Sequence, residues 1–186
     1  DALAGPELHQ VALDVTDDDS VSTAARSLAS LDVLINNAAV CEDEGGRIES
    51  LDLERTAAIL QVNALGPLRV TKAFLPHLRA GAGKTIVNIS SEAGSIAGCW
   101  RKGMFGYSMS KAALNMQSNL LHNHLRDEGF RVLAIHPGWM RTDMGGKNAD
   151  IDPMEAAQEI FDIVSGDKPI APDARYVDYR GNPLRY

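Results

Sequence analysis

The stretch from Ile86 to Lys111, IVNISSEAGSIAGCWRKGMFGYSMSK, decides how the rest of the chain is organised. It opens with an apolar run typical of a buried strand, which ends at Ser90 and Ser91. It closes at the head of a helix-forming run, where Tyr107 and Lys111 stand four residues apart. On a helix this spacing projects both side chains from one face, one turn apart.

A phenol beside an ammonium group is a chemically useful pair. A free tyrosine titrates near pH ~10, and a cation within about 4–6 Å favours the phenolate. Tyr107 is therefore predicted to act as a general acid or base whose pKa Lys111 lowers. A strand-end hydroxyl could hold a substrate oxygen against the phenol; Ser91 is the first candidate and Ser90 its competitor. The set predicts proton transfer at a carbonyl or alcohol oxygen.

Further motifs follow in a fixed order. After VNISS and YSMSK comes an apolar strand pattern at residues 132–135, and then HPGWMRTD. This order resembles the short-chain dehydrogenase/reductase family. The segments SKAALNM, PGWMRTDMGG and YVDYRGNPL are similar to its C-factor and sniffer-type carbonyl reductase branch.

The resemblance implies a fold and a reaction. The expected fold is α/β, with a Rossmann-like, doubly wound parallel sheet. The expected activity is hydride transfer between NAD or NADP and a small carbonyl or secondary alcohol. It also implies that Asn63 holds a water connected to Lys111, which in turn binds the ribose hydroxyls.

The expected cofactor site lies at the carboxyl ends of the strands, the usual ligand side of open α/β sheets. Asp14 matches the family residue that contacts adenine, and Ala39 stands where the family has glycine, which adds a methyl group near the cofactor. The expected cofactor-binding residues are Asp14, Val15, Asn37, Ala38, Tyr107, Lys111, Pro137, Met140 and Thr142.

Composition bounds the remaining possibilities. The 186 residues, 45% of them hydrophobic, fit a single domain over residues 1–186. A net charge of −7 without a basic run argues against nucleic acid and anionic membranes as partners, and no apolar stretch is long enough for a membrane span. We expect a cytoplasmic protein.

Two residue pairs receive no role. Cys41 and Cys99 lack metal-binding spacing and are expected to be reduced thiols. His122 and His124 stand about 200° apart around a helix, so they cannot chelate one metal ion together.

The chain alternates strand and helix patterns. We expect a bend in the second helix at Gly66-Pro67, a helix C-cap at Gly129 and a fully buried strand at residues 32–35. The resemblance further implies that the two long helices pack against a second subunit, giving a homodimer or homotetramer. Strands are predicted at residues 10–15, 32–35, 86–89, 132–135 and 175–178, and helices at 21–31, 51–79, 107–128 and 153–164.

A glycine-rich turn for the pyrophosphate is not found in the sequence. Counted backwards, residues 10–15 match the third strand of the family, so the expectation is that the N-terminal βαβ unit is missing from the given chain. The choice between NAD and NADP depends on that part and stays open.

Three readings of function remain. The first is the oxidoreductase. The second is a non-enzymatic signalling or scaffold protein that keeps the fold. The third is an α/β domain with coincidental motifs. Residues 92–106, longer than the family's usual spacing, form either a surface loop or a substrate lid, and residues 147–152 are a further candidate for a substrate loop.

Overall fold

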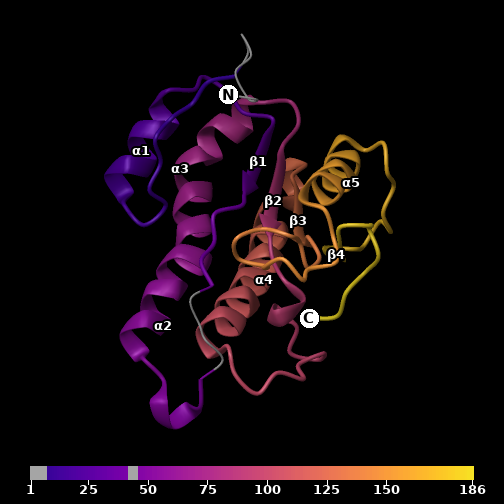
Figure 1. The fold of residues 1–186 in the computed structure, drawn as a ribbon. Helices are drawn as coiled ribbons and strands as arrows, with labels where there is room; N and C mark the ends of the chain where they lie inside the picture. The colour runs from indigo at the N-terminus through magenta and orange to yellow at the C-terminus, as the bar shows by residue number, and fades with distance from the viewer. Residues whose placement is uncertain (1–7, 42–45) are drawn as a thin grey trace.

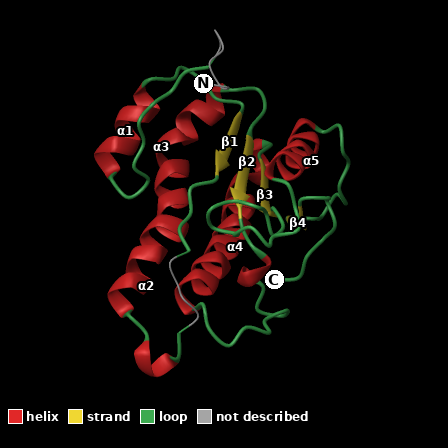
Figure 2. Ribbon diagram, viewed as in Figure 1, coloured by secondary structure: helices red, strands yellow, loops and turns green. Residues whose placement is uncertain are grey.

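A computed structural model describes residues 8–41 and 46–186. Its centre is a parallel sheet of four strands in the order β1-β2-β3-β4 (Figure 2). The strands are β1 (Val33–Asn36), β2 (Thr85–Ile89), β3 (Arg131–His136) and β4 (Tyr176–Asp178). The predicted α/β fold and these four strands are confirmed, with ends that differ by at most one residue.

Helices connect the strands and cover the sheet (Figure 1). They are α1 (Asp18–Arg26), α2 (Leu53–Leu60), α3 (Gly66–Ala80), α4 (Phe105–Leu125) and α5 (Pro153–Ser165). Short 3₁₀ turns lie at Ile48–Ser50, Glu92–Gly94 and Arg126–Glu128, and a π-helical turn at Gln61–Leu65.

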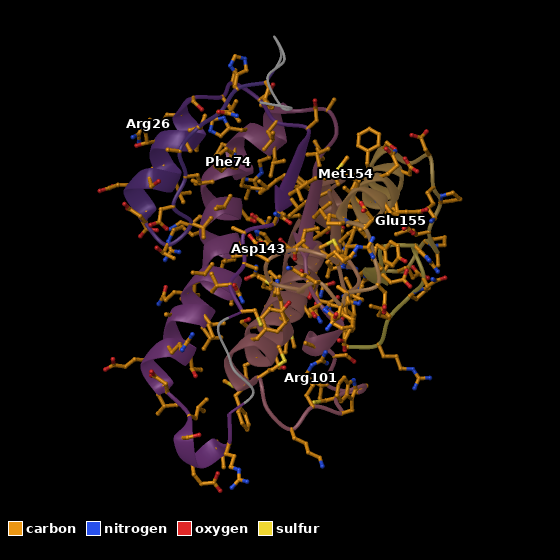
Figure 3. The ribbon with its side chains drawn as sticks, viewed as in Figure 1. Arg26, Phe74, Arg101, Asp143, Met154 and Glu155 are labelled. Carbon is orange, nitrogen blue, oxygen red and sulfur yellow. The ribbon has the colours of Figure 1, made fainter. Side chains whose placement is uncertain are left out.

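Alternate residues of the strands enter two separate cores, as the period of a strand requires. Ile86 and Val132 are paired in register and pack with Phe74 and other residues of the α1 and α3 side; Figure 3 labels Phe74 there. Val87 and Leu133, one residue further along, pack on the opposite face against Ile163 of α5. Helices on both faces make the sheet doubly wound.

Strand β1 differs from the prediction. It was expected to be buried on both faces, yet Ile35 is 48% exposed. Ile35 is the register partner of Val87, and the α5 core that covers Val87 does not extend to it. Within the described residues β1 is an edge strand, which explains the open face.

The predicted strand at residues 10–15 is wrong, because described residues 8–15 form no ladder. Local polar contacts hold the backbone instead. The Asp14 carboxylate accepts hydrogen bonds from the Thr16 backbone N–H (2.8 Å) and hydroxyl (2.7 Å), and the Asp14 N–H donates to Ser20 Oγ at 2.9 Å. Such side-chain turns compete with extended pairing.

Helix α1 starts at Asp18, three residues before the predicted start and inside an acidic run. Asp17 is the N-cap and accepts from the Asp19 N–H at 2.8 Å. The helix ends at Arg26, where Ser27 turns the chain, five residues before the predicted end.

The long predicted helix at residues 51–79 is continuous but irregular. The irregularity is the π-helical turn Gln61–Leu65, directly before Gly66-Pro67, where a bend was expected; proline is tolerated in the first turn of α3. A Cβ on Gly66 would lie 2.9 Å from Val15 Cγ2, so the glycine permits close packing there.

Helix α4 begins at Phe105, two residues earlier than predicted, after Met104 in a left-handed conformation (φ 60°). Gly129 ends the following 3₁₀ turn with φ 83°, as expected of a C-cap.

No helix in the described part of the chain combines the length and apolar character that a membrane span needs. Among the same residues, no cluster of three or more His, Cys, Asp or Glu side chains could hold a metal ion. Neither Cys41 nor Cys99 forms a disulfide bond within the described residues.

Gly94 sets the distance between the 3₁₀ turn after β2 and helix α4. A Cβ at this position would lie 2.6 Å from the Lys111 carbonyl carbon and 2.9 Å from the Ala112 nitrogen. These are backbone atoms, so only movement of the turn or the helix could relieve the clash.

Replacing Gly94 with Ala is expected to lower the free energy of unfolding by roughly 1–3 kcal/mol, as overpacking does. Gly98→Ala is the control, because its nearest new neighbour is the Ser95 side chain at 3.1 Å, and it should change stability by about 0.5 kcal/mol or less. Denaturant unfolding of both variants would measure this. Equal effects would show that the contact between the turn and α4 is not tight.

Candidate active site

One polar face of α4 is bonded to the end of β2. The Lys111 ammonium donates to the Ile89 carbonyl at 2.8 Å. One turn further along the helix, Asn115 accepts from the Ser90 hydroxyl at 2.6 Å. Ser118 follows and accepts from the Asn88 side-chain amide at 2.8 Å. Three successive residues at the end of β2, Asn88, Ile89 and Ser90, are thus hydrogen-bonded to one face of the helix.

These bonds are buried. Lys111, Asn115 and Ser118 are each only 2% exposed, and Asn88 is fully buried. Asn88 also accepts from the Asn36 amide of β1 at 2.8 Å, which extends the network to the neighbouring strand. Unpaired polar groups in such places would be costly, so the network fixes the position of α4 on the sheet.

The structure separates the two candidate serines. The Ser90 hydroxyl donates to Asn115, whereas the Ser91 side chain lies near enough to the Tyr107 phenol to lower its pKa. The carbonyl of Ser91 accepts from the Tyr176 hydroxyl of β4 at 2.7 Å. Ser91 is therefore the serine brought against the phenol, as first expected.

Tyr107 and Lys111 share one face of α4, with the ammonium nitrogen 5.7 Å from the centre of the phenol ring. The pKa of Tyr107 was expected to be lowered by Lys111. This prediction is wrong, because burial raises that pKa above its ordinary value. The Ser91 side chain and the Arg101 charge lower that pKa, but by less. Burial also lowers the pKa of Lys111 to about 8, which weakens its positive charge.

Asn63 lies in the π-helical turn and is 1% exposed. Its side chain accepts from the Val40 N–H and donates to the Val40 carbonyl, both at 2.8 Å. It also donates to the Ser110 hydroxyl at 3.1 Å. Asn63 therefore joins the loop after β1 to the helix that carries Tyr107 and Lys111.

A cavity of about 500 Å³ opens beside Ser91 and Tyr107. Among the expected cofactor residues, Pro137, Met140 and Thr142 line it. The other lining residues are Cys41, Ser90, Glu92, Trp100, Arg101, Met104, His136, Gly138, Trp139, Met144 and Gly145.

The segment at residues 92–106 forms one wall of this cavity. Arg101 makes a two-pronged ion pair with Glu92, and the Ala97 N–H donates to the Tyr186 carbonyl at 2.9 Å. Figure 3 shows Arg101 in the loop that leads to α4, on the side of the molecule where the C-terminus lies. The segment is thus both surface loop and cavity wall.

The segment after β3 forms another wall. The Trp139 indole donates to the Gly145 carbonyl at 2.8 Å, and the Thr142 hydroxyl accepts from the Gly145 N–H at 3.1 Å. Met140 makes a parallel β-bridge with Ile151, within the second predicted substrate loop. These contacts shape a compact turn.

The remaining predicted cofactor residues lie elsewhere. Val15, Asn37 and Ala38 line a smaller, apolar hollow of about 200 Å³ beside β1. Asp14 is exposed and lines neither cavity among those described. The structure therefore brings Ser91, Tyr107, Pro137, Met140 and Thr142 together.

Several residues of the site were missed from the sequence. Asn115 and Ser118 follow Lys111 at intervals of four and three residues, a helical spacing that could have indicated one polar face. His136 is the last residue of β3 and Cys41 lies five residues after the end of β1; both line the cavity. Arg101 and Glu92 gave no local signal, since their pairing depends on the path of the loop.

Comparisons with known proteins agree with this geometry. The sequence profile of the short chain dehydrogenase family matches residues 1–152. C-signal of Myxococcus xanthus is 42% identical over 158 residues, covering 83% of this chain and 92% of that protein. An uncharacterized oxidoreductase of Schizosaccharomyces pombe is 38% identical over 149 residues, covering 78% of this chain and 57% of that protein.

Solved structures show the same fold. The carbonyl reductase Sniffer of D. melanogaster superposes with a TM-score of 0.88 at 29% identity, covering 96% of this chain and 78% of that one. An NADPH-bound carbonyl reductase from chicken fatty liver gives a TM-score of 0.86 at 31% identity, covering 97% and 78%. On its sequence profile, its relatives and its fold, the chain belongs to the short-chain dehydrogenase family.

Proposed function

We propose that this protein is a carbonyl reductase that uses NAD or NADP to interconvert a carbonyl compound and a secondary alcohol. The observation that carries the proposal is that Ser91 and Tyr107 line one cavity large enough for a small substrate, with Ser91 near enough to lower the pKa of the Tyr107 phenol. Relatives among the oxidoreductases and structural likeness to two carbonyl reductases support it.

Tyr107 supplies the proton in the direction of reduction. Burial raises the pKa of its phenol, so the protonated form, which is the donor, dominates at neutral pH. Ser91 orients the substrate carbonyl, whose oxygen takes the Tyr107 proton while its carbon takes a hydride. The Ser91 side chain and the Arg101 charge then stabilise the phenolate that is left.

The cavity residues fit the nicotinamide end of a cofactor, which when bound supplies or accepts the hydride. Met140, Thr142 and Tyr107 line the same cavity. Pro137, the first residue after β3, lines it as well. Val15, Asn37 and Ala38 would contact the remainder, with Asp14 at its adenine end. Three of the similar solved structures contain NADP or NADPH.

Lys111 and Asn63 complete the proposed machinery. Lys111 is held by the Ile89 carbonyl, and with a pKa near 8 it can gain or lose a proton close to neutral pH. Asn63 bonds to Ser110, the residue before Lys111, and would hold a water that returns a proton to the site.

A signalling role is a second candidate, favoured by the 42% identity to C-signal. A signalling role does not require turnover. A Tyr107→Phe variant that still signals would therefore support this second candidate.

A self-association surface is proposed on the long helices. Leu65 and Leu68, around the start of α3, and Met109, Met116 and Leu120 of α4 are 43–61% exposed. The three α4 residues share one face, because they are seven and four residues apart. An apolar stripe of this kind suits a homodimer or homotetramer.

Tyr107→Phe is expected to lower kcat/KM for aldehyde reduction by about 10²–10⁴-fold, since it removes the proton donor. Absorbance of NADPH and NADH during turnover would measure the loss, and cofactor fluorescence would verify binding. Tyr179→Phe removes a hydroxyl from a buried ring outside the cavity lining and is the control. Equal turnover by both variants would defeat the assignment.

Lys111→Met should change how stability depends on pH. Because burial lowers the pKa of Lys111 from 10.5 to about 8, the unfolded state binds more protons between these values, and stability should rise with pH across the window. In the wild-type protein the free energy of unfolding should rise by about 3 kcal/mol over the whole window, and the variant should lack this rise. Urea unfolding of both proteins from pH 7 to 10 would measure it, and parallel curves would contradict the shift.

Leu120→Asp should dissociate the proposed oligomer, because it places a charge in the apolar stripe. Light scattering after size exclusion would report the mass. Phe161→Asp, at an equally exposed apolar position on α5, is the matched control and should leave the mass unchanged. A monomeric wild-type protein would contradict the proposal.

A further inference from the structure

The cavity contains an ion pair between Glu92 and Arg101, and the proposed reaction uses only the charge of the arginine. The Arg101 guanidinium spans both oxygens of the Glu92 carboxylate, with Nη1 2.8 Å from Oε2 and Nη2 in contact with Oε1. The two side chains are 17% and 39% exposed, respectively. The guanidinium also lies over the Trp100 ring, 4.7 Å from its centre. Arg101 is thus held from two sides.

The cavity that the pair lines is rich in large apolar side chains. Five of them line it: Trp100, Met104, Trp139, Met140 and Met144. The other titratable lining groups are Cys41, Tyr107 and His136. Burial raises the pKa of Tyr107 and lowers that of His136, which favours the neutral form of both. Among the described lining residues, the remaining charges are those of Glu92 and Arg101, and they cancel.

We propose that the Glu92–Arg101 pair determines substrate charge specificity: Glu92 occupies the guanidinium, so the cavity accepts uncharged aromatic or aliphatic carbonyl compounds and rejects those that bear a carboxylate. This inference rests on the proposed function.

Glu92 and a substrate carboxylate would compete for the Arg101 guanidinium. Arginine binds carboxylates through two parallel hydrogen bonds, and Glu92 already takes this geometry. A substrate carboxylate entering the cavity would meet like charge from Glu92 and would lose its hydration without gaining a partner. Uncharged aromatic rings lose little hydration free energy on entering the cavity, and they gain contact with Trp100, Trp139 and the methionines.

The same geometry predicts that removing the Glu92 charge shifts the substrate preference towards carboxylates. In Glu92→Gln the amide is neutral, so Arg101 keeps its place beside Trp100 but has an uncompensated charge. With 4-nitrobenzaldehyde and 4-carboxybenzaldehyde as probes, the wild-type enzyme should prefer the uncharged aldehyde in kcat/KM. The variant should raise the ratio of carboxylated to uncharged substrate by about tenfold.

Two further variants separate charge from packing. Arg101→Gln leaves Glu92 uncompensated and should lower the same ratio below the wild-type value. The double variant Glu92→Gln/Arg101→Gln restores neutrality and should return the ratio to near wild type. A merely loosened loop would instead lower kcat/KM for both aldehydes together and leave the ratio unchanged in all three variants, which would overturn the proposal.

A binding measurement distinguishes this inference from the proposed function. Fluorescence of the two tryptophans, both in the cavity wall, would follow titration of the full-length protein with benzyl alcohol and 4-(hydroxymethyl)benzoate. If binding preference switches with Glu92→Gln but no aldehyde is reduced, the reductase proposal fails and the charge selectivity stands. If turnover occurs but neither binding nor kcat/KM changes its preference, the selectivity fails and the reductase stands.

Discussion

The structure depends on the hydrogen bonds that join one face of α4 to the end of β2. Lys111, Asn115 and Ser118 contact three consecutive strand residues, and all three helix residues are buried. Leaving any one of these groups unpaired would cost about 1–3 kcal/mol, more for the ammonium. The helix therefore has one favourable register on the sheet, and Tyr107, one turn before Lys111, is placed by that register.

This constraint explains why a short, irregular segment can form a defined cavity wall. The chain between β2 and α4 is held at both ends by the fixed register. The Glu92–Arg101 pair links its two arms, and the hydrogen bond from the Ala97 N–H to the Tyr186 carbonyl holds its middle. Gly94 allows the first turn of the segment to touch the backbone of α4. Fixed elements position Ser91 and Tyr107, while the loop adds the charged pair and Trp100 to the cavity wall.

Much of this could be predicted from the sequence. The apolar runs of β2 and β3 and the pairing of Tyr107 with Ser91 follow from local patterns, because each depends on residues close in the chain. The strand expected at residues 10–15 failed because extended structure needs a partner, and sequence does not show whether one is present. The direction of the Tyr107 pKa shift was missed for a related reason: burial is set by distant segments, and it outweighs the neighbouring charges.

The buried hydrogen bond from Tyr176 to the Ser91 carbonyl has a consequence for solution studies. Burial raises the pKa of Tyr176 to about 12, so its hydroxyl stays a donor throughout the range in which proteins are usually assayed. The backbone that presents Ser91 is accordingly anchored by a group that does not titrate there. Changes in rate across that range would report on the reacting groups themselves rather than on loss of this support.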